Sequence, residues 1–305
     1  MWLFALNRVL LGLAITVGIS LAVFTLTNIA TDPAIVIAGE NASAKDVEFV
    51  RKAYGFDRPI IERYMRWLGH AARGDFGVSY RQHRPVYDIV FERLPVTFTL
   101  AFAALCVSLT LSLPLAMIAA LRRDSAIDRL ATLVALIGQA IPPFWLALLG
   151  ILLFSVKLGW LPASGAASAA GFVLPAITLG LSVTPAVLRL TRAGLIEVLE
   201  SDYIRMAKAK GLRPPAIIMK HALRNAVVPV ISVASVQFGY MLAGSVVIET
   251  VFALNGIGYL AWEAVTSADI PLVQALVLVT TFLYIFMTLF ADLLNSWIDP
   301  RLRMA

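Results

Sequence analysis

The chain has 305 residues, of which 60% are hydrophobic and 14% are charged. Soluble domains are about 45–50% apolar and about 25% charged, so this composition excludes an ordinary soluble enzyme, a disordered protein and a coiled coil. The formal net charge of +6 does not by itself indicate nucleic acid, because the basic residues of a membrane protein gather in its cytoplasmic loops. The lone cysteine, Cys106, excludes an internal disulfide framework and a cysteine-based zinc site.

Six stretches longer than 20 residues contain no Asp, Glu, Lys, Arg or His. They cover 9–31, 94–121, 130–156, 158–188, 225–248 and 270–291. About 20 apolar residues cross the hydrocarbon core as a helix, and a backbone in lipid must satisfy its own hydrogen bonds. The sequence therefore predicts an all-α polytopic membrane protein with six transmembrane helices.

These stretches also predict the organisation of the chain. We expect an N-terminus and first span at 1–31, an outer segment at 32–95 and a core at 96–305. Within the core we expect spans at about 97–121, 130–156, 172–190, 226–250 and 271–296, a cytoplasmic hairpin at 195–225 and an outer loop at 251–270. Pro142-Pro143 should bend the third span, and Pro175 and Pro185 the fourth.

Basic residues predict the orientation. The loop 122–129 holds three of them and the segment 189–224 holds eight, which places both in the cytoplasm. Six spans then put both termini there. The cytoplasmic side has 14 basic and six acidic residues, whereas the outer side has 11 of each.

No motif indicates catalysis, a bound cofactor or a metal. A phosphate-binding Gly-x-x-x-x-Gly-Lys-Ser/Thr loop is absent from the sequence, and the three histidines are far apart and outside any His-Glu-x-x-His pattern. Gly256-Ile257-Gly258-Tyr259-Leu260-Ala261 matches a dinucleotide pattern, but it follows no strand and falls in the expected outer loop.

Polar residues in or near the spans have two interpretations. Gln139 and Gln237 could line a translocation path, or they could form hydrogen bonds between helices. Glu249 and Asp292 lie near span ends, where we expect them to reach interfacial water or to pair with an arginine. Cys106 is expected to be a small apolar filler.

The hairpin at 195–225 is the most informative segment. A helix is expected from Leu195 to Lys210, with Glu197, Glu200 and Asp202 near its start, ended by Gly211 in a left-handed conformation. Pro214-Pro215 then fits the start of a second helix. The small residues Ala207, Ala209 and Gly211 would let another protein approach closely; the alternative is an amphipathic hairpin on lipid.

This segment resembles a known family. Arg205-Met206-Ala207-Lys208-Ala209-Lys210-Gly211 resembles the Glu-Ala-Ala-x-x-x-Gly loop of ABC-importer permeases, and with 221–229 it is similar to the dipeptide/oligopeptide/nickel subfamily. Arg205 replaces the general motif's Glu, and Arg224 stands where its closing Pro would fall. Stretches similar to the subfamily also occur at 39–42, 54–59, 73–79, 92–97, 141–145, 158–165, 249–252, 292–295 and 299–301.

The resemblance implies a type I ABC importer permease fold with cytoplasmic termini, in a multi-pass protein of the bacterial inner membrane. It implies a non-catalytic subunit that binds no cofactor itself and pairs with a second homologous permease, two ATPase subunits carrying ATP and Mg, and a periplasmic or lipid-anchored substrate-binding protein. Membrane lipid surrounds it, and no nucleic acid is expected. Dipeptides, oligopeptides, nickel chelates and opines all remain open as substrates.

The resemblance also assigns the hairpin as the element that couples the permease to an ATPase. The residues assigned to it are Asp202, Tyr203, Arg205, Ala207, Ala209, Gly211, Leu212, His221, Arg224 and Asn225. The alternative of a self-sufficient secondary transporter would need ionisable groups inside the membrane, and an intramembrane enzyme would need a Ser/His or metal constellation. The six stretches contain no histidine or carboxylate.

Overall fold

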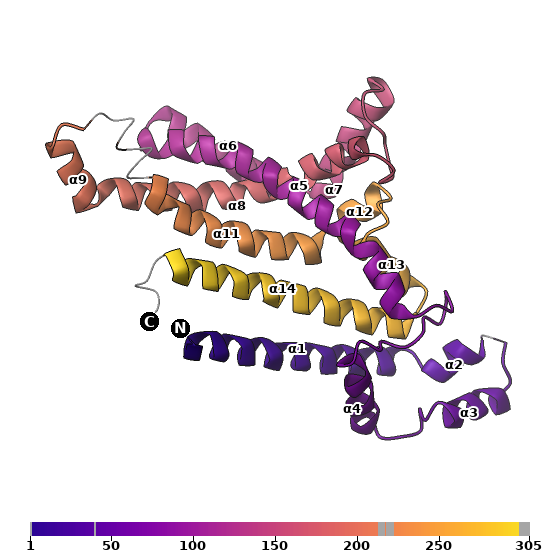
Figure 1. Cartoon of the computed structure of the whole chain (residues 1–305). Helices are drawn as coiled ribbons and strands as arrows, with labels where there is room; N and C mark the ends of the chain where they lie inside the picture. The colour runs from indigo at the N-terminus through magenta and orange to yellow at the C-terminus, as the bar shows by residue number, and fades with distance from the viewer. Residues whose placement is uncertain (1, 40, 213–216, 218–222, 299–305) are drawn as a thin grey trace.

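The computed structural model describes residues 2–39, 41–212, 217 and 223–298 (Figure 1). In this part of the chain every element is helical, apart from one isolated bridge between Val78 and Pro85. The start of α1 (Trp2–Ala30), α9 (Asp202–Ala209) and the end of α14 (Ile270–Ile298) lie at the same end of the bundle (Figure 1). The predicted all-α fold is confirmed; the side of the membrane on which this end lies stays a prediction.

Four of the described helices are long and apolar enough to cross a bilayer: α1, α5 (Val86–Leu121), α8 (Val173–Glu200) and α14. A fifth crossing is possible where two helices pass the same test together but are bent by 92°. The span expected at 226–250 corresponds to α11 (Leu223–Gly244), whose apolar part Val230–Leu242 is shorter than a full crossing. By length and composition, four or five helices of the described chain thus span the membrane.

The bent pair occupies the third span expected at 130–156, where Pro142-Pro143 was expected to bend the helix. α6 (Ala126–Ala140) ends before Pro142-Pro143, α7 (Pro143–Gly150) begins there, and the chain continues as a π-helix, η1 (Ile151–Lys157). Proline has no N–H to continue the helical ladder and disfavours the α conformation of the preceding residue, so the helix stops and restarts. The predicted bend is confirmed, and it is sharp enough to divide the span.

Several other helix bounds differ from expectation. α5 begins at Val86, eleven residues before the expected start at 97. α8 follows the short η2 (Ala169–Phe172) and continues to Glu200, ten residues past the expected end at 190, with Pro185 inside it. The expected outer loop at 251–270 contains a helix, α13 (Ile257–Thr266), preceded by α12 (Val246–Val251).

The outer segment consists of three short helices: α2 (Pro33–Ala38), α3 (Ala44–Ala53) and α4 (Ile60–Ala71). Local capping explains two of them. The Asp32 carboxylate accepts from the Ala34 N–H at 3.0 Å, and Ser43 and Asp46 form a capping box. Figure 1 shows α2 and α3 beyond the end of α1 and α4 beside its last part, at the opposite end of the bundle from α9.

The core joins α5, α8, α11 and α12. Its buried members include Leu100, Ala104, Leu179, Met241 and Phe252. At Gly180 an added Cβ would lie 2.6 Å from the carbonyl oxygen of Ala104, so the backbones of α5 and α8 approach too closely for any side chain there. Small residues allow such contact where lipid gives helices no hydrophobic reason to associate.

Candidate functional site

The predicted hairpin begins later than the sequence indicates. α8 continues to Glu200, and Ser201, whose backbone is extended with ψ 153°, separates it from α9. The expected helix from Leu195 to Lys210 is therefore wrong at its start. Only Asp202 lies in the first turn of α9, where the helix dipole favours a carboxylate.

The end of α9 lies where the sequence predicts it. Gly211 has φ +76°, its N–H donates to the carbonyl of Lys208 at 2.9 Å, and the N–H of Leu212 donates to the carbonyl of Ala207 at 3.3 Å. These two bonds form a Schellman motif, which needs a left-handed residue after the helix. The prediction that Gly211 ends this helix is confirmed.

The two faces of α9 differ. Ile204 and Ala207 are buried together with Ile217, against Val198 and Leu199 of α8. Tyr203, Arg205, Met206, Lys208, Ala209 and Leu212 are exposed. The predicted small-residue surface is thus wrong at Ala207, which is 7% exposed and holds α9 onto α8.

Three predicted hairpin residues lie beyond Leu212 in the chain. His221 falls outside the described residues, as does most of the second limb. The described backbone places Arg224 and Asn225 in the first turn of α11. The prediction of a second helix starting at Pro214-Pro215 likewise falls outside the described chain.

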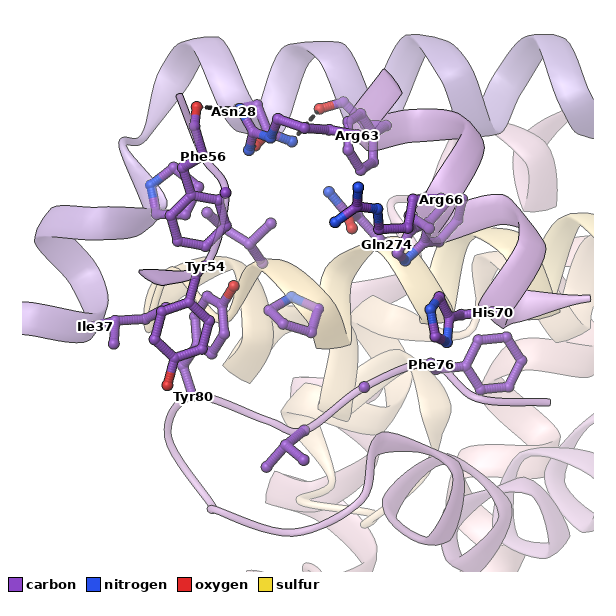
Figure 2. Close-up of a pocket in the computed structure, with 18 of the residues that line it drawn as sticks. Asn28, Ile37, Tyr54, Phe56, Arg63, Arg66, His70, Phe76, Tyr80 and Gln274 are labelled. Carbon is purple, nitrogen blue, oxygen red and sulfur yellow. Dashed lines mark hydrogen bonds between the residues drawn. The ribbon is translucent and has the colours of Figure 1, made fainter. Parts of the chain in front are cut away.

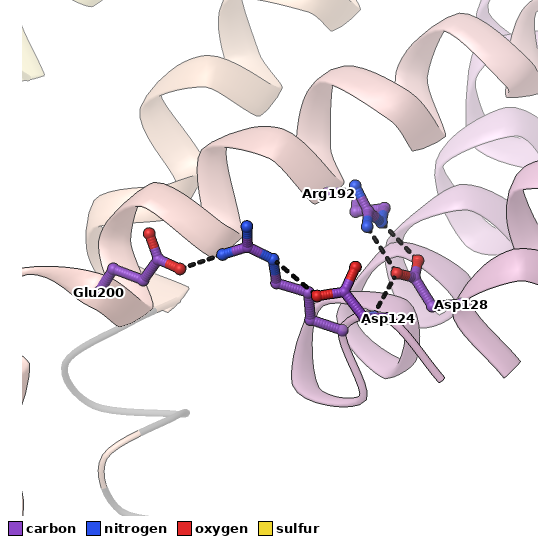
Figure 3. A network of polar contacts seen from close by, with 5 residues as sticks. Asp124, Asp128, Arg192 and Glu200 are labelled. Atoms are coloured by element: carbon purple, nitrogen blue, oxygen red, sulfur yellow. Dashed lines mark hydrogen bonds and ion pairs between the residues drawn. The ribbon is translucent and has the colours of Figure 1, made fainter. Parts of the chain in front are cut away.

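A group of ion pairs connects the turn between α5 and α6 to the last part of α8 (Figure 3). Arg192 donates from Nε and Nη2 to the two carboxylate oxygens of Asp128, each at 2.6 Å, and the Asp124 N–H donates to Asp128 at 3.0 Å. Arg123 bonds Glu200 and lies 3.5 Å from Asp124. We call these residues the α6–α8 clamp.

The clamp holds the last part of α8, the helix that directly precedes α9 in the chain. Asp128 is buried, and its backbone N–H donates to Ser125 Oγ at 3.4 Å. Its carboxylate accepts from both Arg192 and the Asp124 N–H, so backbone and side chain are both held. Bidentate pairing of a planar guanidinium with a carboxylate restricts distance and angle together. The clamp therefore ties the last part of α8 to the start of α6, the first helix of the bent pair.

The two glutamines have different surroundings. Gln139, at the end of α6, is exposed, and its carbonyl oxygen accepts from Arg189 Nη1 of α8 at 2.7 Å. Gln237 is partly buried within α11. An interhelical bond is thus present at Gln139; a role of either residue in a translocation path stays a prediction.

The surroundings of Glu249 differ from those expected from the sequence. It was expected to reach interfacial water or to pair with an arginine. Instead it is 0% exposed and accepts from Thr97 Oγ1 at 2.8 Å, Ser245 Oγ at 2.6 Å and the Tyr259 N–H at 2.9 Å. Thr97 also accepts from the Ile257 N–H at 2.8 Å. This Glu249 cluster joins α5, α12 and the N-terminus of α13, where backbone N–H groups favour an anion.

The remaining expectations concern Asp292 and Cys106. Asp292 lies 3.3 Å from Arg8 Nη1, which confirms pairing with an arginine. Cys106, which was expected to be a small apolar filler, is exposed. In the part of the chain that the structure describes, no group of three or more His, Cys, Asp or Glu side chains could hold a metal ion.

Comparison with protein families identifies the fold and its context. The model of the "binding-protein-dependent transport system inner membrane component" family matches residues 112–304, and that of its membrane-component N-terminal region matches residues 1–101. The chain belongs to this family. It is a transmembrane permease component of a binding-protein-dependent ABC importer and a multi-pass protein of the bacterial inner membrane, not a self-sufficient secondary transporter.

Two curated relatives match almost end to end. The glutathione transport system permease protein GsiC of Escherichia coli (strain K12) is 38% identical over 296 residues, covering 96% of this chain and 97% of the relative. A putative peptide transport system permease protein of Brucella abortus (strain 2308) is 37% identical over 307 residues and covers 98% of each chain. The permease family inferred from the motifs is confirmed.

A solved structure supports the fold. A chain of the MetNI methionine ABC transporter, in an inward-facing conformation, superposes with a TM-score of 0.59 at 17% identity, covering 69% of this chain and 96% of that one. The part shared with that shorter chain is the type I importer permease core.

The sequence missed the clamp and the Glu249 cluster. Both depend on partners at least 60 residues apart along the chain, such as Asp128 with Arg192 and Thr97 with Glu249. One signal was available for the second. The glycines of Gly256-Ile257-Gly258, which resemble part of a dinucleotide motif, allow the backbone to approach Glu249 closely.

Proposed function

We propose that this permease imports peptides or closely related solutes in an ATP-driven complex. The names of its relatives, a glutathione and a putative peptide transport permease, support this substrate class. The chain would form half of the translocation pathway beside a second homologous permease. A periplasmic or lipid-anchored binding protein would deliver the solute at the end of the bundle that carries α2–α4.

Coupling is proposed to pass through α9. The observation that carries this proposal is the division of its faces: Ile204 and Ala207 fix the helix to α8, while Tyr203, Arg205 and Met206 face outward. An ATPase subunit that holds ATP and Mg would bind this exposed face of α9. The permease itself would perform no catalysis.

The clamp supplies the route from α9 to the membrane helices. Movement of α9 shifts the end of α8, and the Arg192–Asp128 pair transmits the shift to α6. Gln139 is held by Arg189 on the same two helices, and we propose that it and Gln237 line the pathway. The restricted geometry of a bidentate pair would make this route stiff enough to carry motion.

Two methionines provide a matched test of docking. Met206 on α9 and Met65 on α4 are each 60% exposed. Met206→Glu places a charge in the proposed ATPase interface, so we expect at least a ten-fold loss of both ATPase co-purification and transport, because burying an unpaired charge is costly. Met65→Glu should leave co-purification unchanged.

Membrane insertion and pairing with the second permease should be normal in both variants. If Met206→Glu retained full ATPase association and coupled transport, α9 would not be the docking element. If Met65→Glu alone lost ATPase association, the assignment of the two ends of the bundle would be reversed.

A further inference from the structure

The outer segment encloses a cavity of about 640 Å³ that transport coupling does not use (Figure 2). It lies between the end of α1, the helices α2 and α4, the loop 75–83 and the start of α14. Its volume is within the range of about 300–1,000 Å³ found for small-molecule sites. A cavity of this size on a segment outside the bundle requires an explanation of its own.

The walls of the cavity are largely aromatic, and an arginine is set among them. The aromatic lining residues are Phe24, Tyr54, Phe56, Trp67, Phe76 and Tyr80. The Arg63 guanidinium is 5.1 Å from the centre of the Phe56 ring and 6.0 Å from that of Phe24. Figure 2 shows Tyr54 and Phe56 on one side of the opening, with Arg66 and His70 on the other.

Arg63 is bonded to neutral groups. It donates to Asn28 Oδ1 and, at 3.4 Å, to the carbonyl oxygen of Phe56. Burial lowers the pKa of Arg63, yet arginine stays charged in proteins. Asp32, an acid whose charge acts on Arg63, is already held by Arg51 at 2.6 Å and by the Ala34 N–H.

The remaining carboxylates at the cavity pair with groups other than Arg63. Arg58 and Arg66 share a single carboxylate, that of Glu62, at 2.8 and 3.2 Å. Asp75 pairs with His70 at 3.0 Å. Trp67 Nε1 is also buried with no hydrogen-bond partner among the described residues. The cavity therefore combines an excess of cationic donors with apolar walls.

We propose that this cavity binds a small solute in which a carboxylate adjoins an aromatic or other apolar group. The carboxylate would lie at Arg63 and Arg66, whose planar guanidinium groups match its geometry. The apolar part would lie between Phe24, Phe56 and Tyr80. The site goes beyond the proposed transport function, since it lies between the outer segment and the adjoining ends of α1 and α14, away from α6, α8 and α9, which are proposed to carry the coupling.

Direct binding to the full-length chain in lipid nanodiscs tests the proposal. The probe is N-acetylphenylalanine, and its amide is the neutral control with the same apolar group. We expect saturable calorimetric binding of the acid at least ten-fold tighter than of the amide. Arg63→Gln should weaken binding of the acid at least ten-fold, and Arg66→Gln should weaken it several-fold. Arg73 is an exposed arginine outside the lining, so Arg73→Gln should leave the affinity unchanged.

Three results would overturn the proposal: equal affinity for acid and amide, binding of inorganic phosphate as tight as that of the acid, or co-purified phospholipid that the probe does not displace. Should Arg63→Gln fail to fold, Arg66→Gln and the amide still decide. Because binding is measured without ATP or transport, its failure would leave the proposed function standing, and a failed transport assay would leave this site intact.

Discussion

At the scale of single residues, the Glu249 cluster shows how a buried carboxylate is accommodated. Two hydroxyls and a backbone N–H donate to it, so the desolvated group has partners. The neighbouring backbone is equally constrained. A Cβ at Gly256 would lie 2.4 Å from Glu249 Oε2, and a Cβ at Gly258 would lie 2.7 Å from Val246 Cα.

We therefore expect Gly258→Ala to destabilise the protein by about 1–3 kcal/mol, because the new methyl group meets backbone that cannot rotate away. The matched control is Gly69→Ala, at an exposed position inside α4 where a Cβ meets nothing within 4 Å. That change should stabilise by up to about 1 kcal/mol through helix propensity. Thermal unfolding of the purified chains measures both, and equal midpoints for the two variants would contradict the packing argument.

Tyr80 gives a prediction for alkaline pH. Burial, followed by the charge of Asp269, raises the pKa of Tyr80 to about 12. The unfolded chain ionises this phenol near pH 10, so Tyr80 does not oppose folding below that pH and does so increasingly between about pH 10 and 12. The absorbance at 295 nm should show a late titration step in this range that Tyr80→Phe lacks. A step at pH 10 lost in Tyr80→Phe would show that the phenol is solvated.

At the scale of helices, we expect the α6–α8 clamp to stabilise the folded protein as well as to transmit motion. Asp128→Asn and Arg192→Gln should each cost about 1.5–3 kcal/mol, as hydrogen bonds between charged, largely buried groups do. The double variant should lose less than the sum, because each single change already breaks the pair. Thermal unfolding measures the stability and solute uptake with ATPase activity measures the coupling.

The control for the clamp is the exposed pair Glu48–Lys52 of α3, 3.4 Å apart, changed in the same way to Gln. Surface pairs of this kind contribute little, so stability and transport should stay near those of the native protein. Strict additivity of the Asp128 and Arg192 changes would show that the two residues act independently and that the clamp transmits nothing.

The ends of the helices show what the sequence could not predict. A run without charges predicts that a helix crosses the membrane, but a charged residue does not end that helix when a partner satisfies it. α8 continues past Arg189 and Arg192 because Gln139 and Asp128 bond them. Local chemistry, by contrast, was sufficient at Gly211, where the left-handed residue and its two hydrogen bonds lie within five positions.

In the candidate site too, local sequence predicts some features and packing between distant segments decides the others. The motif around Gly211 identified the hairpin, but which of its small residues faces outward depends on what packs behind it. Ala207 is buried because Ile217 and the end of α8 cover it, a contact that no spacing rule gives. Glu249 was misplaced for a related reason: its donors come from helices on both sides, and α13 was expected to be a loop.

At the scale of the whole molecule, α1 is a peripheral helix attached to α14. Arg8 pairs with Asp292 near one end, and Gln274 Nε2 donates to Thr27 Oγ1 at 3.1 Å near the other. Gly12 lies between them, where a Cβ would be 3.9 Å from the Cβ of Ile285. The two helices are thus in contact along their length, and we expect them to move as one unit during transport.

An engineered disulfide between α1 and α14 tests whether the two helices move together. A Cβ–Cβ separation of 3.9 Å is close to the mean of about 3.8 Å in natural disulfides, so Gly12→Cys with Ile285→Cys, in a chain with Cys106→Ser, should cross-link nearly completely on mild oxidation. Gly18→Cys with Ile285→Cys is the control, because a Cβ at Gly18 meets nothing within 4 Å. Loss of maleimide labelling reports the bond. Transport should persist in the cross-linked protein; if the bond forms and transport stops, α1 must slide along α14 in every cycle.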